Sequence, residues 1–219
     1  MDYQPRAAIV GAGPNGLTAA ARLAMAGWSV DIYERAGWAG GAAASSTEIF
    51  PGTIVDLGAA GHPFGVASPA FHALDLESHG LRWLNASYPM AHPLEGAPAG
   101  ILQSSLADTA AELGVDAHAW TRLHGHIVRH IDEHVANALT PLVRWPDRPM
   151  RLAQFGAAGT LPASQLGRAV LATPQARALF AGSAVHAITS PTRPFTSAFG
   201  LLFGGLGMTR GLSLIHISE

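Results

Sequence analysis

The chain has 219 residues, a formal net charge of −2 and a pI near 6.6, so its composition carries no basic signal for a nucleic-acid partner. It contains no cysteine, and all 13 of its basic residues are arginine. Disulfide and thiol redox chemistry, a phosphate-loop lysine and a lysine Schiff base are therefore excluded. The length is enough for one or two domains with a sizeable core.

The N-terminal stretch AAIVGAGPNGLTAAARLAMAGWSVDIYER, residues 7–35, predicts a strand, a helix and a second strand. Its first four residues form a short apolar run that is typical of a strand buried in a parallel sheet. We expect a helix over residues 14–26, ended by Gly27, and a strand over residues 30–33. The stretch therefore predicts a βαβ unit of an α/β fold.

The turn after the first strand has the G-x-G-x-x-G spacing, with Gly11, Gly13 and Gly16. In this pattern the first glycine permits the tight turn, the second lets a pyrophosphate approach the backbone, and the third lets the helix pack closely. The N-terminus of the helix offers N–H groups to the same phosphates. Glu34 ends the second strand, where a carboxylate accepts the hydroxyls of an adenosine ribose. We therefore predict a site for an ADP moiety.

The glycine turn alone does not separate NAD from FAD. A carboxylate at Glu34 repels the 2′-phosphate of NADP, and the neighbouring Arg35 leaves that cofactor open. The next segment, RAGWAGGAAASS (residues 35–46), places Gly40 and Gly41 where a second close backbone approach to the cofactor can occur. This glycine pair favours FAD over NAD.

Three segments carry a family resemblance: GAGPNGL, GTIVDLGAAGHPFGVASPAF (residues 52–71) and SPTRPFTSAFGLLFGGLG (residues 190–207). With the glycine pair, they resemble phytoene desaturase-like FAD-dependent oxidoreductases, in particular the branch related to pyridine nucleotide-disulfide oxidoreductase domain-containing protein 2. The resemblance reaches about Arg210 and is most specific over the first 65 residues. It implies a Rossmann-like FAD-binding portion over residues 1–66 and a mostly helical substrate-binding or lid portion over residues 67–210, together an incomplete two-domain flavoprotein.

The resemblance also implies the cofactor site. Glycines of the turn would contact the FAD pyrophosphate, Glu34 the adenosine ribose, and the glycine pair and its neighbours would lie along the same cofactor. Many relatives place an arginine after the glycine pair, but residues 42–44 are all alanine here, which puts that side-chain contact in doubt. The expected cofactor-binding residues are Gly11, Ala12, Gly13, Pro14, Asn15, Gly16, Glu34, Arg35, Gly40, Gly41 and Ala42. The sequence identifies no catalytic residue.

The activity implied by the resemblance is oxidation or desaturation of a small apolar substrate by hydride transfer to flavin. Three alternatives stay open: an amine oxidase-like flavoenzyme, a non-catalytic nucleotide-binding or scaffold protein, and an NAD-dependent dehydrogenase, which the glycine pair disfavours. Family members are longer, and residues 211–219, ending in LSLIHISE, do not resemble the family. We therefore expect a truncated reading frame whose product is inactive alone.

The second half predicts mostly helices. Expected elements are helices over residues 68–80, 105–114, 116–139 and from Thr173 onward, and strands over residues 81–85 and 99–103, with the turn-rich YPMAHPLEGAP between the strands. The apolar stretch over residues 195–208 is shorter than the ~20 residues of a membrane-spanning helix and predicts a buried helix or one lining a lipophilic pocket. The N-terminus lacks the apolar region of a signal peptide, which predicts a cytoplasmic protein. Peripheral membrane contact stays open.

Histidines suggest two further roles. His126, His130 and His134 are spaced by four residues, and HIDEH fits the H-x-x-E-H zinc signature with Glu133 as the base. Such a site needs a third protein ligand from a downstream carboxylate, and only Asp147 and Glu219 follow, so we predict a solvated helix face and no metal site. His62 follows the glycine-rich DLGAAG, and the resemblance implies a position near the flavin.

Overall fold

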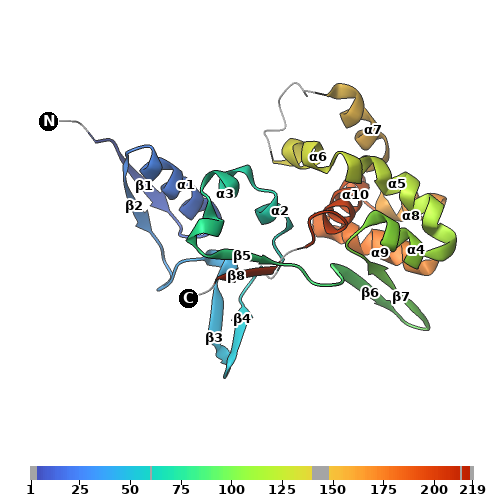
Figure 1. Cartoon of the computed structure of the whole chain (residues 1–219), viewed down its shortest axis with the longest axis horizontal. Coiled ribbons are helices and arrows are strands. Elements are labelled where there is room, and N and C mark those ends of the chain that lie inside the picture. Colours follow the sequence, from blue (N-terminus) through green and yellow to red (C-terminus); the bar gives the residue numbers. More distant parts are fainter. Residues whose placement is uncertain (1–3, 60, 140–147, 213, 218–219) are drawn as a thin grey trace. The chain divides into compact units, whose positions relative to one another are not determined.

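The computed structural model describes residues 4–59, 61–139, 148–212 and 214–217 (Figure 1). The chain forms two compact units: Met1–Trp83 with Leu214–Glu219, called here the nucleotide unit, and Leu84–Ser213, called the helical unit. The division predicted after residue 66 rests on the family resemblance and stays a prediction.

The nucleotide unit begins with the predicted βαβ arrangement. Strands β1 (Arg6–Val10) and β2 (Ser29–Tyr33) pair in parallel, with Arg6 opposite Ser29 and Val10 opposite Tyr33. Helix α1 (Pro14–Met25) connects them and has proline in its first turn, where a missing N–H costs nothing. The predicted order of strand, helix and strand is confirmed. The predicted burial of the first strand is wrong, because none of its residues is buried and Val10 is 88% exposed.

The remainder of the nucleotide unit is built from short elements. They are the 3₁₀ turn η1 (Gly41–Ala43), the antiparallel strands β3 (Ser45–Phe50) and β4 (Thr53–Asp56), helices α2 (Pro63–Val66) and α3 (Pro69–Ala73), the 3₁₀ turn η2 (Leu76–His79), and β5 (Leu81–Leu84), which pairs with β8 (Leu214–Ile217). The helix predicted over residues 68–80 is wrong in one respect. Asp75 adopts a left-handed conformation at φ +49°, and this breaks the helix into α3 and η2.

The helical unit starts with a hairpin of β6 (Met90–Leu94) and β7 (Ala97–Leu102). Strand β6 lies in the segment that is predicted to be turn-rich, so sequence reasoning missed this strand. Its proline suggested a turn, but a proline is tolerated in a two-stranded sheet, where both strands are edge strands. The helices are α4 (Leu106–Glu112), α5 (Ala117–Arg129), α6 (Ile131–Ala138), α7 (Pro149–Gly159), α8 (Ala163–Val170), α9 (Pro174–Ala184) and α10 (Thr196–Gly207), with 3₁₀ turns η3 (Gly114–Asp116) and η4 (Val185–Ala187). The single helix predicted over residues 116–139 is broken at His130, whose φ of −124° is not helical.

The core of the helical unit surrounds α10, the buried helix predicted from its apolar sequence (Figure 1). Trp120 of α5 and Phe180 of α9 are fully buried there. The indole of Trp120 donates a hydrogen bond to Sδ of Met208 at 3.4 Å. A Cβ on Gly200 would lie 2.9 Å from the ring of Phe180, so the absence of a side chain lets α9 and α10 approach closely.

Asp116 joins two helix starts in this unit. The sequence predicts it as the N-cap of the following helix, but its side chain makes no capping bond there. Its carboxylate instead accepts hydrogen bonds from the backbone N–H of Ala172 at 2.7 Å and of Thr173 at 2.8 Å, and from the Thr173 hydroxyl at 2.6 Å. Asp116 is buried, and these donors compensate its lost hydration.

Candidate functional site: the glycine turn and its neighbours

Residues 11–16, called here the glycine turn, connect β1 to α1. Gly11 has φ +96°, and its N–H donates to the carbonyl of Tyr33 at 2.8 Å, which ties the turn to the end of β2. A Cβ on Gly16 would lie 2.0 Å from the carbonyl oxygen of Gly11 and 3.4 Å from Ile9. Only glycine permits this approach of the helix to the turn, as the sequence pattern predicts.

The first turn of α1 leaves backbone donors available. The N–H of Leu17 donates to the carbonyl of Gly13 at 2.9 Å and is the first to bond along the helix. The N–H groups of Asn15 and Gly16 precede it and have no intrahelical acceptor by the geometry of a helix start. With the positive end of the helix dipole, these N–H groups make the helix start suited to an anion, as the sequence pattern predicts.

Residues 40–44, called here the glycine-pair loop, pack directly on the glycine turn. The N–H of Gly40 donates to the carbonyl of Ala12 at 2.8 Å, and a Cβ on Gly41 would lie 2.9 Å from Cα of Gly13. Both residues of the pair have positive φ, +116° and +56°. The structure thus brings together the two glycine motifs that the sequence separates by more than twenty residues, through contacts that side chains would prevent.

The other side of the glycine-pair loop is bonded to the segment after β4. Leu57 donates to the carbonyl of Ala44 at 2.9 Å, and Ala59 donates to that of Ala42 at 2.7 Å. A Cβ on Gly58 would lie 2.8 Å from the same Ala42 oxygen. Residues 40–44 therefore lie between the glycine turn and residues 57–59, which follow β4. Backbone hydrogen bonds fix the conformation of this loop on both sides.

Glu34 lies beside the glycine turn and is hydrogen-bonded to it. One carboxylate oxygen accepts from the N–H of Ala12 at 2.7 Å, and the other accepts from the N–H of Ala36 at 2.8 Å. These bonds, first that of Ala36 and then that of Ala12, hold the pKa of the Glu34 carboxyl below its ordinary value. The group is ionised at neutral pH, and each oxygen retains a lone pair for a further donor such as a ribose hydroxyl.

The remaining predicted residues differ in their surroundings. Ala12 is buried within the turn, and Pro14 occupies the first position of α1. Arg35 follows Glu34 and is exposed, while Ala42 uses its carbonyl to hold Ala59. All eleven predicted residues thus lie in the glycine turn, the glycine-pair loop or the end of β2, and their contact with a cofactor stays a prediction.

The histidine segment lies in the helical unit, at the junction of α5 and α6. The ring centroids of His126 and His130 are 5.0 Å apart, and those of His126 and His134 are 5.5 Å apart. His134 is buried against Phe155, and burial lowers its pKa to about 4. The prediction that these histidines lie on a solvent-exposed helix face is therefore wrong for His134, whose side chain is buried. Within the described residues, no group of three histidine, aspartate or glutamate side chains is arranged to hold a metal ion.

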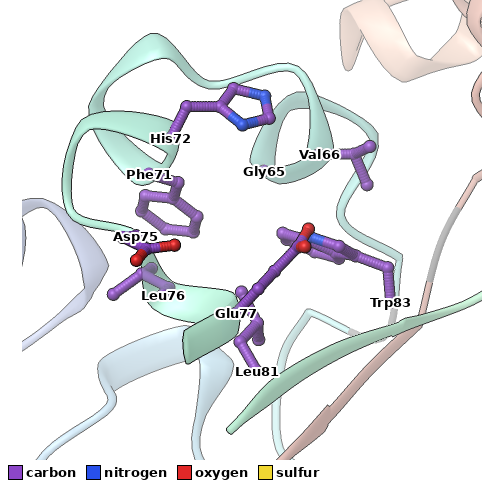
Figure 2. A pocket seen from close by; sticks show the side chains of 9 residues that line it. All are labelled: Gly65, Val66, Phe71, His72, Asp75, Leu76, Glu77, Leu81 and Trp83. Atoms are coloured by element: carbon purple, nitrogen blue, oxygen red, sulfur yellow. The ribbon is translucent and has the colours of Figure 1, made fainter. Parts of the chain in front are cut away.

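His62 precedes α2 as its N-terminal cap residue and makes no capping bond through its side chain. The following segment forms a pocket of about 230 Å³ that sequence reasoning missed (Figure 2). Its lining includes the carboxylates of Asp75 and Glu77 and the rings of Phe71 and Trp83. The left-handed conformation of Asp75 and the close approach of Gly65 to Trp83 shape it; neither follows from a sequence motif.

Comparisons with known proteins agree with this geometry. The family model of the NAD(P)-binding Rossmann-like domain matches residues 9–75, which contain the glycine turn, Glu34 and the glycine-pair loop. No curated protein matches the sequence.

No helix in the described part of the chain is long and apolar enough to cross a membrane.

Solved structures of putrescine oxidase are similar to the chain. The wild type bound to putrescine has a TM-score of 0.54 at 19% identity, and a single and a triple mutant made to redesign cofactor binding have TM-scores of 0.55 and 0.53 at 18% identity. Each similarity covers 97% of this chain and 46% of the putrescine oxidase chain, so this chain spans about half the length of those proteins. The chain therefore has an α/β fold with a Rossmann-like dinucleotide-binding domain, similar to part of the putrescine oxidase structure, and the predicted fold class is confirmed.

Proposed function

We propose that the chain binds FAD at the glycine turn and forms part of an FAD-dependent oxidoreductase that dehydrogenates a mostly apolar substrate. The observation that supports this best is the packing of Gly41 on Gly13, with a Cβ-to-Cα distance of only 2.9 Å if Gly41 carried a side chain. A βαβ unit that binds NAD needs the glycine turn and the acid after β2. The second glycine loop against the turn is the feature that the resemblance to FAD-dependent oxidoreductases implies.

The residues present fit a dinucleotide. A Cβ on Gly11 would meet no atom within 4 Å, and one on Gly13 would meet only Gly41 at 3.9 Å, so the face of the turn has room for a pyrophosphate. The N–H groups of Asn15 and Gly16 would bind its oxygens. Glu34 would accept the ribose hydroxyls, because its carboxylate is ionised and held in place by two backbone donors.

A bound flavin supplies the hydride acceptor. In this proposal the nucleotide unit binds and orients that group.

The test is a titration of FAD followed by quenching of flavin fluorescence. We expect Glu34→Ala to weaken FAD binding by about ten-fold or more, because a charge-assisted hydrogen bond to the ribose is lost. The matched control Glu48→Ala removes an exposed carboxylate of β3 and should leave the affinity unchanged. Unchanged binding in Glu34→Ala, or displacement of FAD by equimolar NAD⁺, would contradict the proposal.

Amine oxidation is the second candidate, and two observations favour it. The chain shares its fold with part of putrescine oxidase, and the pocket of Figure 2 combines two carboxylates with two aromatic rings. Carboxylates and aromatic faces both attract an organic cation. Bleaching of bound flavin by putrescine without oxygen would favour this candidate over dehydrogenation of an apolar substrate.

A further inference from the structure

The helical unit contains a second cavity, whose charged lining residue is an arginine, whereas the pocket of Figure 2 has two carboxylates. It has a volume of about 320 Å³ and lies between α5 and α7, with Leu201 of α10 also in its wall. Apolar side chains, among them Leu123 and Phe155, form most of the lining, and Arg122, His126 and Gln154 supply the polar groups. Its size and its few polar groups on apolar walls are those of a small-molecule site.

No acidic residue occurs in α5, α7 or α10, the three helices that line this cavity. Glu133 of α6 is the acid that acts on the pKa of His126, and it forms ion pairs with Arg148 at 3.7 Å and with Arg151. Arg122 is exposed and has no ion-pair partner among the residues that the structure describes. The cavity therefore has an uncompensated cationic group at its edge.

His126 adds a hydrogen-bonding group. The ring of His126 lines the cavity. Its Nδ1 is buried and has no hydrogen-bond partner within the described ranges, so a ligand in the cavity would bond to the ring through Nε2. Burial, His130 and the arginines at 151 and 129 lower the pKa of His126, and Glu133 opposes them only in part. The ring is thus neutral at pH 7, with one nitrogen able to donate, and its surroundings are net positive.

We propose that this cavity binds a small amphipathic carboxylate, with the apolar body between α5 and α7 and the anionic group at Arg122 and His126. An ammonium ligand such as a diamine is disfavoured, because it would meet Arg122 without any carboxylate in the lining. A neutral apolar ligand would give neither the guanidinium of Arg122 nor the ring of His126 a hydrogen-bond partner. The site uses no residue of the nucleotide unit, so it is independent of the proposed flavin binding.

The test is calorimetric titration of the full chain with octanoate, 1-octanol and octylammonium, which share an apolar body and differ in charge. We expect octanoate to bind at least about ten-fold more tightly than octanol, and octylammonium to bind more weakly than octanol. Arg122→Gln should reduce the octanoate affinity to that of octanol and leave octanol unchanged. Because Arg122 is exposed, this variant should fold normally.

Two control variants locate the ligand. Arg129→Gln removes an exposed charge of α5 that lies outside the lining and acts on His126 only through its charge. Since solvent screens this charge, the variant should lower the octanoate affinity by less than about two-fold. Arg168→Gln alters a separate cavity between α8 and α9, which Arg168 and Arg177 line, and should have no effect. Absence of octanoate binding, equal binding of the three ligands, or a loss in Arg168→Gln instead of Arg122→Gln would overturn the proposal.

Discussion

The two units of the chain hold their shapes by different means. Among the described residues of the nucleotide unit, the buried apolar ones are Ala12, Ala20 and Ala44. Large apolar side chains lie at its surface, and Val10 is 88% exposed. In the helical unit Trp120, Phe180 and a set of leucines are fully buried around α10. One unit relies on backbone contacts between glycines, and the other relies on a packed side-chain core.

The backbone contacts between glycines in the nucleotide unit fit the site proposed there. A site for a dinucleotide needs backbone N–H groups and space, so residues 11–16 and 40–44 gain from having no side chains. The helical unit contains cavities between its helices, and close packing of the core side chains keeps those helices in place. Removing buried side-chain atoms should therefore destabilise the helical unit most. The described residues of the nucleotide unit include no large buried side chain, so there the sensitive change is the addition of a Cβ to a glycine of the turn.

Trp120→Ala should have the largest effect. It removes a fully buried ring that stacks on His124 with centroids 4.1 Å apart, and we expect a loss of about 3–5 kcal/mol in the free energy of unfolding. Hydrogen exchange measured peptide by peptide should show faster exchange in α5, α9 and α10. A loss confined to the nucleotide unit would remove the distinction between the two units.

The buried His124 should make the helical unit sensitive to acid. Burial lowers its pKa from 6.5 to about 4, and the carbonyls of Trp120 and Gly200 oppose this only in part. The unfolded chain therefore binds the proton first. The contribution of His124 to the free energy of unfolding is complete above about pH 6.5 and declines by about 3 kcal/mol as the pH falls from 6.5 to about 4. Urea unfolding at several pH values should show a shallower decline for His124→Leu than for the wild type, with the part due to His134 remaining. Parallel curves would contradict this assignment.

Gly16→Ala should abolish flavin retention and cost about 1–3 kcal/mol in the nucleotide unit, because the new Cβ would lie 2.0 Å from the Gly11 carbonyl oxygen. Gly37→Ala is the matched control in the same unit, since a Cβ there would meet nothing within 4 Å. Flavin absorbance after desalting and exchange of the β1–α1 peptides report the two effects. Equal behaviour of the two variants would show that the close packing of the turn does not matter.

Val10→Ser should have the smallest effect, within about 0.5 kcal/mol, although it removes an apolar side chain from a strand. The reason is that Val10 is 88% exposed. A thermal melt of the variant checks this. A loss of more than about 2 kcal/mol would mean that Val10 is covered in solution, and that the nucleotide unit has a core like that of the helical unit.

The elements that a sequence motif or an apolar pattern specifies are predicted correctly, and those that depend on tertiary packing are not. The strands, the helix and the role of Gly16 follow from the glycine spacing, and the buried α10 follows from its apolar composition. The break at His130 and the left-handed Asp75 were not predictable, because tertiary packing sets both against the local helical pattern. The backbone bonds of Glu34 were missed, since the motif assigns its carboxylate to the ribose alone.

The most direct test of the central claim is hydrogen exchange of the full chain with and without FAD. The account predicts slower exchange in the presence of FAD within residues 11–16 and 34–44, where the glycine turn, Glu34 and the glycine-pair loop meet. NAD⁺ at the same concentration should give less protection in residues 40–44. No protection by FAD, or equal protection of residues 40–44 by NAD⁺, would contradict the assignment of this site to FAD.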